Sequence, residues 1–133
     1  MDARAQTSLE LLMVVSFSIL LALIISIPFL ENQARTNAGI QAKLAVLPYI
    51  ERNTELLKIS SITAEKTTPA GTTKLTVMVH TKGKIDSVIS NELSSSGCLS
   101  ICSQIKSGGF FDSVDFSWEN DTLPSNVCSI QNC

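Results

Sequence analysis

The chain has 133 residues, of which 12 are acidic and 10 basic, and its formal net charge at pH 7 is −2. This charge argues against a nucleic-acid partner, because proteins that bind polyanions normally carry a basic face. The basic residues are scattered singly, so the sequence also lacks the polybasic cluster typical of binding to lipid headgroups. Without its apolar N-terminal segment the chain keeps about a hundred residues, enough for one small domain.

The apolar segment covers residues 11–30, which contain no Asp, Glu, Lys, Arg or His. At about 1.5 Å per residue it forms a helix of about 30 Å, the thickness of a bilayer hydrocarbon core. A cleaved secretory signal fits less well, because only Arg4 precedes the run, Asp2 balances it, and no clear Ala-x-Ala site follows. The segment therefore predicts a membrane helix, and its flanking charges give little information on orientation.

The helical pattern extends on both sides of this segment. Thr7 and Ser8 offer capping hydroxyls at its start. After residue 30 an amphipathic stripe recurs at steps of three and four residues, formed by Ala34, Ala38, Ala42, Ala45 and Tyr49. We therefore predict one long helix over residues 6–52, whose second part, residues 31–52, covers a head domain with one face.

Two prolines interrupt this pattern. Pro28 and Pro48 each remove a backbone hydrogen bond, so each predicts a bend in the helix. The alternative is a pair of helices separated by a break at the stretch IPFLEN.

Residues 53–133 predict a small globular head in which an antiparallel sheet packs against the long helix, an α+β fold. Two stretches rich in β-branched residues flank the turn-rich KTTPAGTT and predict a hairpin. The expected elements are strands over 56–65 and 74–81, a short helix over 84–93 that SSSG ends, a helical turn over 98–106, and a strand over 110–120 with Val114, Phe116 and Trp118 on one side.

All four cysteines lie in the last 36 positions, at Cys98, Cys102, Cys128 and Cys133. An even number of cysteines beyond a membrane segment favours disulfides and an oxidising exterior. A zinc site is the weaker interpretation, because the C-x2-C spacing is absent. Three pairings are open, and bridges between the first two cysteines and the last two would hold the chain end. Asn120-Asp121-Thr122 is a glycosylation acceptor pattern, which is meaningful only in an exported domain.

Residues for catalysis are not evident in the sequence. His80, the only histidine, has no nucleophile motif to serve, and no phosphate-binding loop or metalloprotease motif occurs. Asp112 and Asp115 would point to opposite faces of a strand. We therefore expect no enzymatic activity, no metal site and no cofactor.

Glu10 is the one ionisable residue at the head of the apolar run. An acid near the edge of a hydrocarbon core costs about 2–3 kcal/mol unless it has a partner. It could simply lie at the headgroup level in contact with water. Alternatively, cleavage before Gln6 would create an α-amino group four residues upstream, and in a bundle of helices the amine of one copy could meet the acid of the next. Such a pair favours one axial register, because a slip leaves two charges uncompensated.

The stretch AQTSLELL resembles the processing region of archaeal type IV pilin-like proteins with a class III signal peptide. The resemblance implies a leader of residues 1–5, cleavage between Ala5 and Gln6 by a membrane prepilin peptidase, and Glu10 as the acid at the fifth mature position. Pro28 and Pro48 resemble the helix-bending prolines of type IV pilins. In that family the precursor lies in the cell membrane, and assembly machinery polymerises it into an extracellular filament with the helices in the core.

This resemblance makes a structural subunit that polymerises with itself the preferred hypothesis. A minor pilin or pseudopilin, including a TadE-like protein, is the alternative within the same class. A monomeric, membrane-anchored binding module at the cell surface is an alternative of another class, and an exported enzyme ranks last. Whether such a filament serves adhesion, secretion, DNA uptake or motility is not specified by the sequence.

Overall fold

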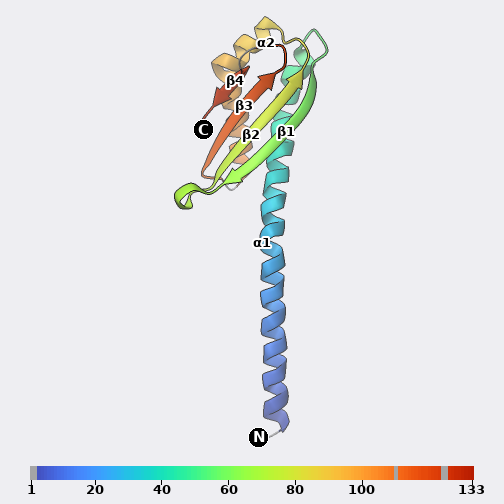
Figure 1. Cartoon of the computed structure of the whole chain (residues 1–133), viewed down its shortest axis with the longest axis vertical. Coiled ribbons are helices and arrows are strands. Elements are labelled where there is room, and N and C mark those ends of the chain that lie inside the picture. Colours follow the sequence, from blue (N-terminus) through green and yellow to red (C-terminus); the bar gives the residue numbers. More distant parts are fainter. Residues whose placement is uncertain (1–2, 110, 124–125) are drawn as a thin grey trace. The chain divides into compact units, whose positions relative to one another are not determined.

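The computed structural model describes residues 3–109, 111–123 and 126–133, with side chains from Gln6 onward (Figure 1). Contacts between residues divide the chain into two compact units, one ending at Gln33 and one beginning at Ala34. The elements in chain order are α1 (Ala3–Arg52), β1 (Lys58–Thr67), η1 (Pro69–Gly71), β2 (Lys74–Lys82), α2 (Ser87–Glu92), η2 (Leu93–Gly97), α3 (Cys98–Ser107), β3 (Ser113–Asn120) and β4 (Cys128–Ile130). The chain is thus a long N-terminal apolar helix followed by an α+β head.

The first unit consists of α1 up to residue 33, and every side chain from Gln6 to Gln33 is exposed. Three serines interrupt its apolar surface, and each hydroxyl donates a hydrogen bond to the carbonyl four residues earlier in the same helix; the pairs are Ser16–Leu12, Ser18–Val14 and Ser26–Ala22. These polar groups are therefore satisfied within the helix, which an apolar environment requires.

Helix α1 runs through both Pro28 and Pro48 without a break. The alternative of two helices separated at IPFLEN is therefore not what the structure shows. The bends expected at the two prolines stay a prediction. The predicted end of the helix at residue 52 agrees with the structure, but the compact head begins at Ala34, so it includes the last part of α1 as well as residues 53–133.

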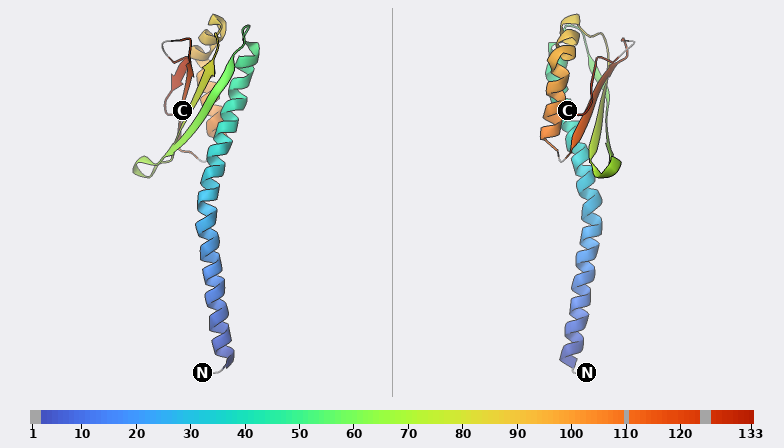
Figure 2. Two further views of the ribbon diagram at one scale, coloured as in Figure 1. Left: turned by 45° about the vertical axis from the view of Figure 1, so that its right-hand side comes forward. Right: turned by 90° about the vertical axis from the view of Figure 1, so that its left-hand side faces the viewer.

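The head contains a four-stranded sheet of order β1-β2-β3-β4. Strands β1 and β2 form the predicted antiparallel hairpin, and β4 is antiparallel to β3. Strands β2 and β3 are parallel, so the prediction of a purely antiparallel sheet was wrong for the central pair. The reason is that the helical connection between them crosses one face of the sheet and returns the chain in the same direction (Figures 1 and 2).

The two predicted helical segments after the hairpin are present as α2 and α3, but the stretch SSSG does not end the first of them. The chain continues through the π-helical turn η2, in which Ser94 and Ser95 donate hydrogen bonds to the carbonyls of Asn91 and Glu92. Gly97 is needed there, because a Cβ would lie 2.9 Å from the Tyr49 hydroxyl. The serine hydroxyls are thus bonded within the helical run, which continues past them into α3.

Helices cover one face of the sheet, and the core lies between the two layers (Figure 2). Small residues of α1 let that helix approach the sheet closely, and Tyr49 makes an edge contact with Trp118 at a ring distance of 6.4 Å. The buried residues include Ala38, Ala42, Ala45 and Val46 from α1, Leu75, Val77 and Val79 from β2, Ile101 and Ile105 from α3, and Val114, Phe116 and Trp118 from β3. The last three confirm the predicted inner side of that strand.

The edge strand β1 also receives a polar contact from α1. The Nε and Nη2 atoms of Arg35 both donate hydrogen bonds to the carbonyl oxygen of Ala64, at 3.2 and 3.1 Å. Arg35 thereby connects α1 to the side of the sheet where β1 has no neighbouring strand.

Candidate functional site

The first candidate site is the apolar surface of α1 in the N-terminal unit. This helix is long and apolar enough to cross a membrane. Its large apolar side chains are exposed around the whole circumference rather than on one side: Leu9, Leu11, Leu12, Met13, Val14, Val15, Phe17, Ile19, Leu20, Leu21, Leu23, Ile24, Ile25, Ile27, Phe29 and Leu30. A helix that is apolar all round requires lipid or other apolar helices around it.

Glu10 lies at the head of this surface, between Leu9 and Leu11, whose side chains are 60% and 69% exposed. Gln6 is exposed four residues earlier on the same helix. Among the side chains that the structure describes, no basic group lies within ion-pair distance of Glu10. Met1 and Asp2 of the expected leader, and the side chain of Ala5, lie outside the described residues, so cleavage between Ala5 and Gln6 stays a prediction.

The four cysteines form two disulfides, as the sequence predicted. Cys98 is bonded to Cys128 and Cys102 to Cys133, and each Cα pair is 6.1 Å apart. Both bridges join α3 to the C-terminal segment, so the predicted tie between the two halves of the cysteine set is confirmed and its connectivity is now defined. The Lys106 ammonium donates a hydrogen bond to the Cys133 carbonyl at 2.7 Å, which holds the same segment.

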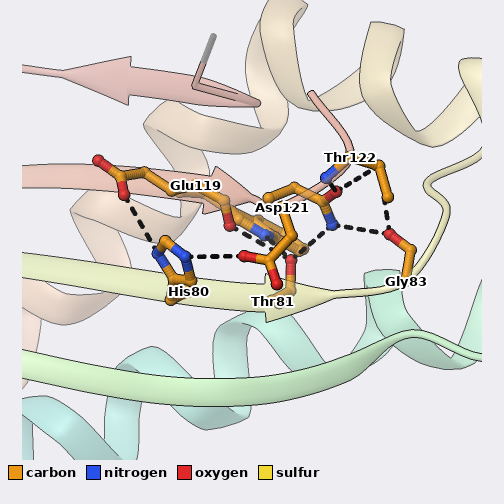
Figure 3. A network of polar contacts seen from close by, with 8 residues as sticks. His80, Thr81, Gly83, Glu119, Asp121 and Thr122 are labelled. Atoms are coloured by element: carbon orange, nitrogen blue, oxygen red, sulfur yellow. Dashed lines mark hydrogen bonds and ion pairs between the residues drawn. The ribbon is translucent and has the colours of Figure 1, made fainter. Parts of the chain in front are cut away.

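His80 lies on β2 between two carboxylates (Figure 3). Its Nδ1 is 3.1 Å from Glu119 Oε2, and its Nε2 is 3.0 Å from Asp121 Oδ1. Because the two acids contact opposite nitrogens, they do not converge on a common point where a metal ion or a reacting atom would lie. Sequence reasoning missed this contact, since it depends on the parallel register that pairs His80 with Glu119.

Asn120, the residue of the acceptor pattern, is a buried structural residue with 4% exposure. Its Nδ2 donates hydrogen bonds to Thr81 Oγ1 and to the Gly83 carbonyl, both at 3.0 Å. Its Oδ1 accepts from the amide and the hydroxyl of Thr122 (Figure 3). A glycan on Nδ2 would remove one of the two donated bonds and would have to leave the interior. The modification stays a prediction, and this geometry counts against it in the folded head.

The structure thus brings together the four cysteines, places Glu10 and Gln6 on one exposed helical surface, and places Asn120 in the interior of the head. In the part of the chain that the structure describes, no group of three His, Cys, Asp or Glu side chains could hold a metal ion. No family model, no curated protein and no solved structure matches this chain.

Proposed function

We propose that this chain is a subunit of a pilus-like filament at the cell surface, inserted in the membrane as a precursor and polymerised through its N-terminal helix. The observation that carries the proposal is the charge-free surface of residues 11–30, which the chain itself leaves entirely exposed and which begins directly after Glu10. Removal of residues 1–5 by a prepilin peptidase and incorporation by assembly machinery belong to the same proposal.

The free energy gained by removing these apolar side chains from water indicates that the surface is covered by lipid or protein. Burying one Leu, Ile, Phe or Met side chain is worth about 1.5–3 kcal/mol. The sixteen exposed side chains named above therefore represent tens of kcal/mol, more than the about 5–15 kcal/mol by which a whole domain is stable. In the precursor, lipid would cover this surface, and in the filament the helices of neighbouring copies would cover it.

Glu10 would then fix the register of neighbouring copies. In a dry bundle its carboxylate is costly unless a cation lies against it. The α-amino group created at Gln6 is such a cation, and it lies on the same helix only four residues away. Copies shifted by the right amount place the amine of one against the acid of the next, and any other shift leaves both uncompensated.

The test is substitution of Glu10 in the native chain. For Glu10→Ala and Glu10→Gln we expect normal insertion in the membrane fraction and loss of the subunit from sheared filaments viewed by electron microscopy. Glu10→Asp keeps the charge on a shorter side chain and should assemble partially. The control is Glu51→Ala, which removes an exposed acid near the other end of α1.

Filaments of normal yield from Glu10→Gln would contradict the pairing. A strain that expresses the unaltered chain but yields no filaments would contradict polymerisation itself. This result would favour the monomeric, membrane-anchored module. A filament containing this chain only at its tip would favour a minor pilin or pseudopilin. The disulfide-bonded head supports a location outside the reducing cytoplasm in each of these cases.

A further inference from the structure

Helices do not cover the second face of the sheet (Figure 2). Several of the side chains that line this face are polar, among them Thr76, Ser117 and Ser129. Where β2, β3 and β4 lie side by side, this face is hollowed by a cavity of about 210 Å³. Five side chains that carry hydroxyl or amide groups line the cavity: Thr76, Ser117, Asn126, Ser129 and Gln131. They come from three strands and the segments on either side of β4, so the fold brings together residues that are up to 55 positions apart in the sequence.

These five side chains have unused capacity for hydrogen bonds. Within the described part of the chain, none of them donates or accepts a hydrogen bond. Each hydroxyl can donate and accept, and each carboxamide has a donor and an acceptor end. Together they line one small space with both donors and acceptors.

Both carboxylates at this cavity already have polar partners within the head. Asp115 Oδ2 is 2.8 Å from the Lys74 ammonium, and its Oδ1 accepts a hydrogen bond from the Asn132 amide at 2.9 Å. Glu119 contacts His80. The described residues that line the cavity include no basic side chain to hold an anion, and five of them carry neutral hydroxyl or amide groups, which favours a neutral ligand. Met78 is 37% exposed and supplies an apolar patch on the wall.

We propose that this cavity binds a neutral, polyhydroxylated ligand, a terminal saccharide unit. Sugar hydroxyls both donate and accept, which matches the mixed lining, and the C–H face of a sugar ring is apolar, which matches Met78. The volume lies below the about 300–1,000 Å³ typical of sites for drug-sized molecules, so the part of the ligand that enters must be small. This inference does not depend on polymerisation, since every residue that lines the cavity belongs to the head.

The experiment uses the full chain in micelles of a detergent without a sugar headgroup. The probes are the methyl glycosides of glucose, galactose, mannose and N-acetylglucosamine, titrated in the millimolar range, and the readout is the backbone amide shift in two-dimensional NMR. We expect at least one glycoside to shift the amides of Thr76, Ser117, Ser129 and Gln131 in a saturable way. Ser117→Ala and Ser129→Ala should each raise its Kd about fivefold, the effect of one lost hydrogen bond.

The matched control is Ser100→Ala, an exposed serine of α3 on the other layer of the head, which should leave Kd unchanged. Two separate cavity variants are used so that a folding defect in one of them does not decide the result. The dispersion of the amide spectrum reports directly whether each variant is folded. Absence of saturable shifts with all four glycosides, or shifts that map outside the cavity, would overturn the proposal. Nα-acetyl-lysine amide keeps a charged ε-ammonium. Its binding at the same residues in preference to every glycoside would also overturn the proposal, since it would show that the site takes a cation.

Discussion

The two units of this chain treat apolar residues in opposite ways. In the head, α1 turns small residues such as Ala38 and Ala42 toward the sheet and buries them almost completely. In the N-terminal unit the same helix carries far larger side chains, and Phe17 and Leu20 are 64% and 55% exposed. The head therefore closes its own core, whereas the N-terminal unit has an apolar surface that only other molecules can cover. Hydrophobicity alone does not make a core; a facing layer in the same chain is needed.

The strongest way to sharpen this comparison is a pair of identical substitutions, Phe116→Ala in the head and Phe17→Ala in the N-terminal unit. Phe116 is 1% exposed, so its loss should lower the free energy of unfolding of the head by about 3–5 kcal/mol. Phe17→Ala should leave that quantity unchanged. Both variants keep Trp118, the only tryptophan, whose fluorescence follows unfolding in denaturant. Equal effects of the two substitutions would show that the units are not independent.

Removal of a disulfide is the next largest effect, and it concerns the head alone. Cys102→Ser with Cys133→Ser opens a bridge across 31 positions, for which the chain-entropy model gives about 3–4 kcal/mol of lost stability. Cys98→Ser with Cys128→Ser opens a bridge across 30 positions and serves as the comparison. Near-equal losses in denaturant titrations would support the entropic account. A loss confined to one pair would show that local strain or packing decides instead.

Asn120→Ala should have an intermediate effect on the head. It removes the donor to Thr81 and Gly83 and the acceptor for Thr122, so we expect a loss of about 1–3 kcal/mol in unfolding free energy. Asn126→Ala, at an exposed position, should cost almost nothing. Intact-mass analysis of exported protein should also show no glycan at Asn120. A glycan on a head that unfolds cooperatively would contradict the structural role assigned to this amide.

The smallest expected effect is on pH dependence. Partial burial acts to raise the pKa of Asp115, but the hydrogen bonds from Lys74 and from the Asn132 amide and the Lys74 charge outweigh it, so the pKa lies below its usual value. A carboxyl whose pKa is lowered by folding stabilises the head above the unfolded pKa of 3.8, and this contribution is lost as the pH falls through the lower folded value.

Asp115→Asn should therefore flatten the loss of stability below about pH 4 by less than about 1 kcal/mol, the range of partly exposed ion pairs. Unfolding free energies measured from neutral pH downward would show this, with Glu65→Gln on the exposed edge strand as the control. An unchanged acid limb in Asp115→Asn would assign the acid sensitivity to other carboxyls.

Local signals explain what the sequence could predict. The run of residues 11–30, the hairpin of β1 and β2, and the inner side of β3 all follow from composition and from periods of two or four residues, which depend on near neighbours only. The presence of disulfides followed from the position and number of the cysteines, whereas the pairing that ties α3 to the chain end was one of three that the sequence left open. Each of these features is encoded within one segment or in a count.

The features that were missed depend on distant partners. The parallel pairing of β2 with β3 arises from a crossover that spans α2 and α3, and the contact between His80 and Glu119 follows from that pairing. The short strand β4 exists because β3 offers it an edge. The interior position of Asn120 could not be predicted for the same reason. Its hydrogen bonds are accepted by Thr81, which lies on β2, and by Gly83, which follows that strand.

The Arg35 contact has a consequence for heads held at high local concentration. Strand β1 is ten residues long and lies at the sheet edge, where a strand from another molecule could extend the sheet and cause aggregation. A guanidinium already occupies the Ala64 carbonyl near the middle of this strand, and an incoming strand would have to displace it. In a dense array of such heads, the Arg35 hydrogen bonds would thus oppose edge-to-edge association of neighbouring sheets.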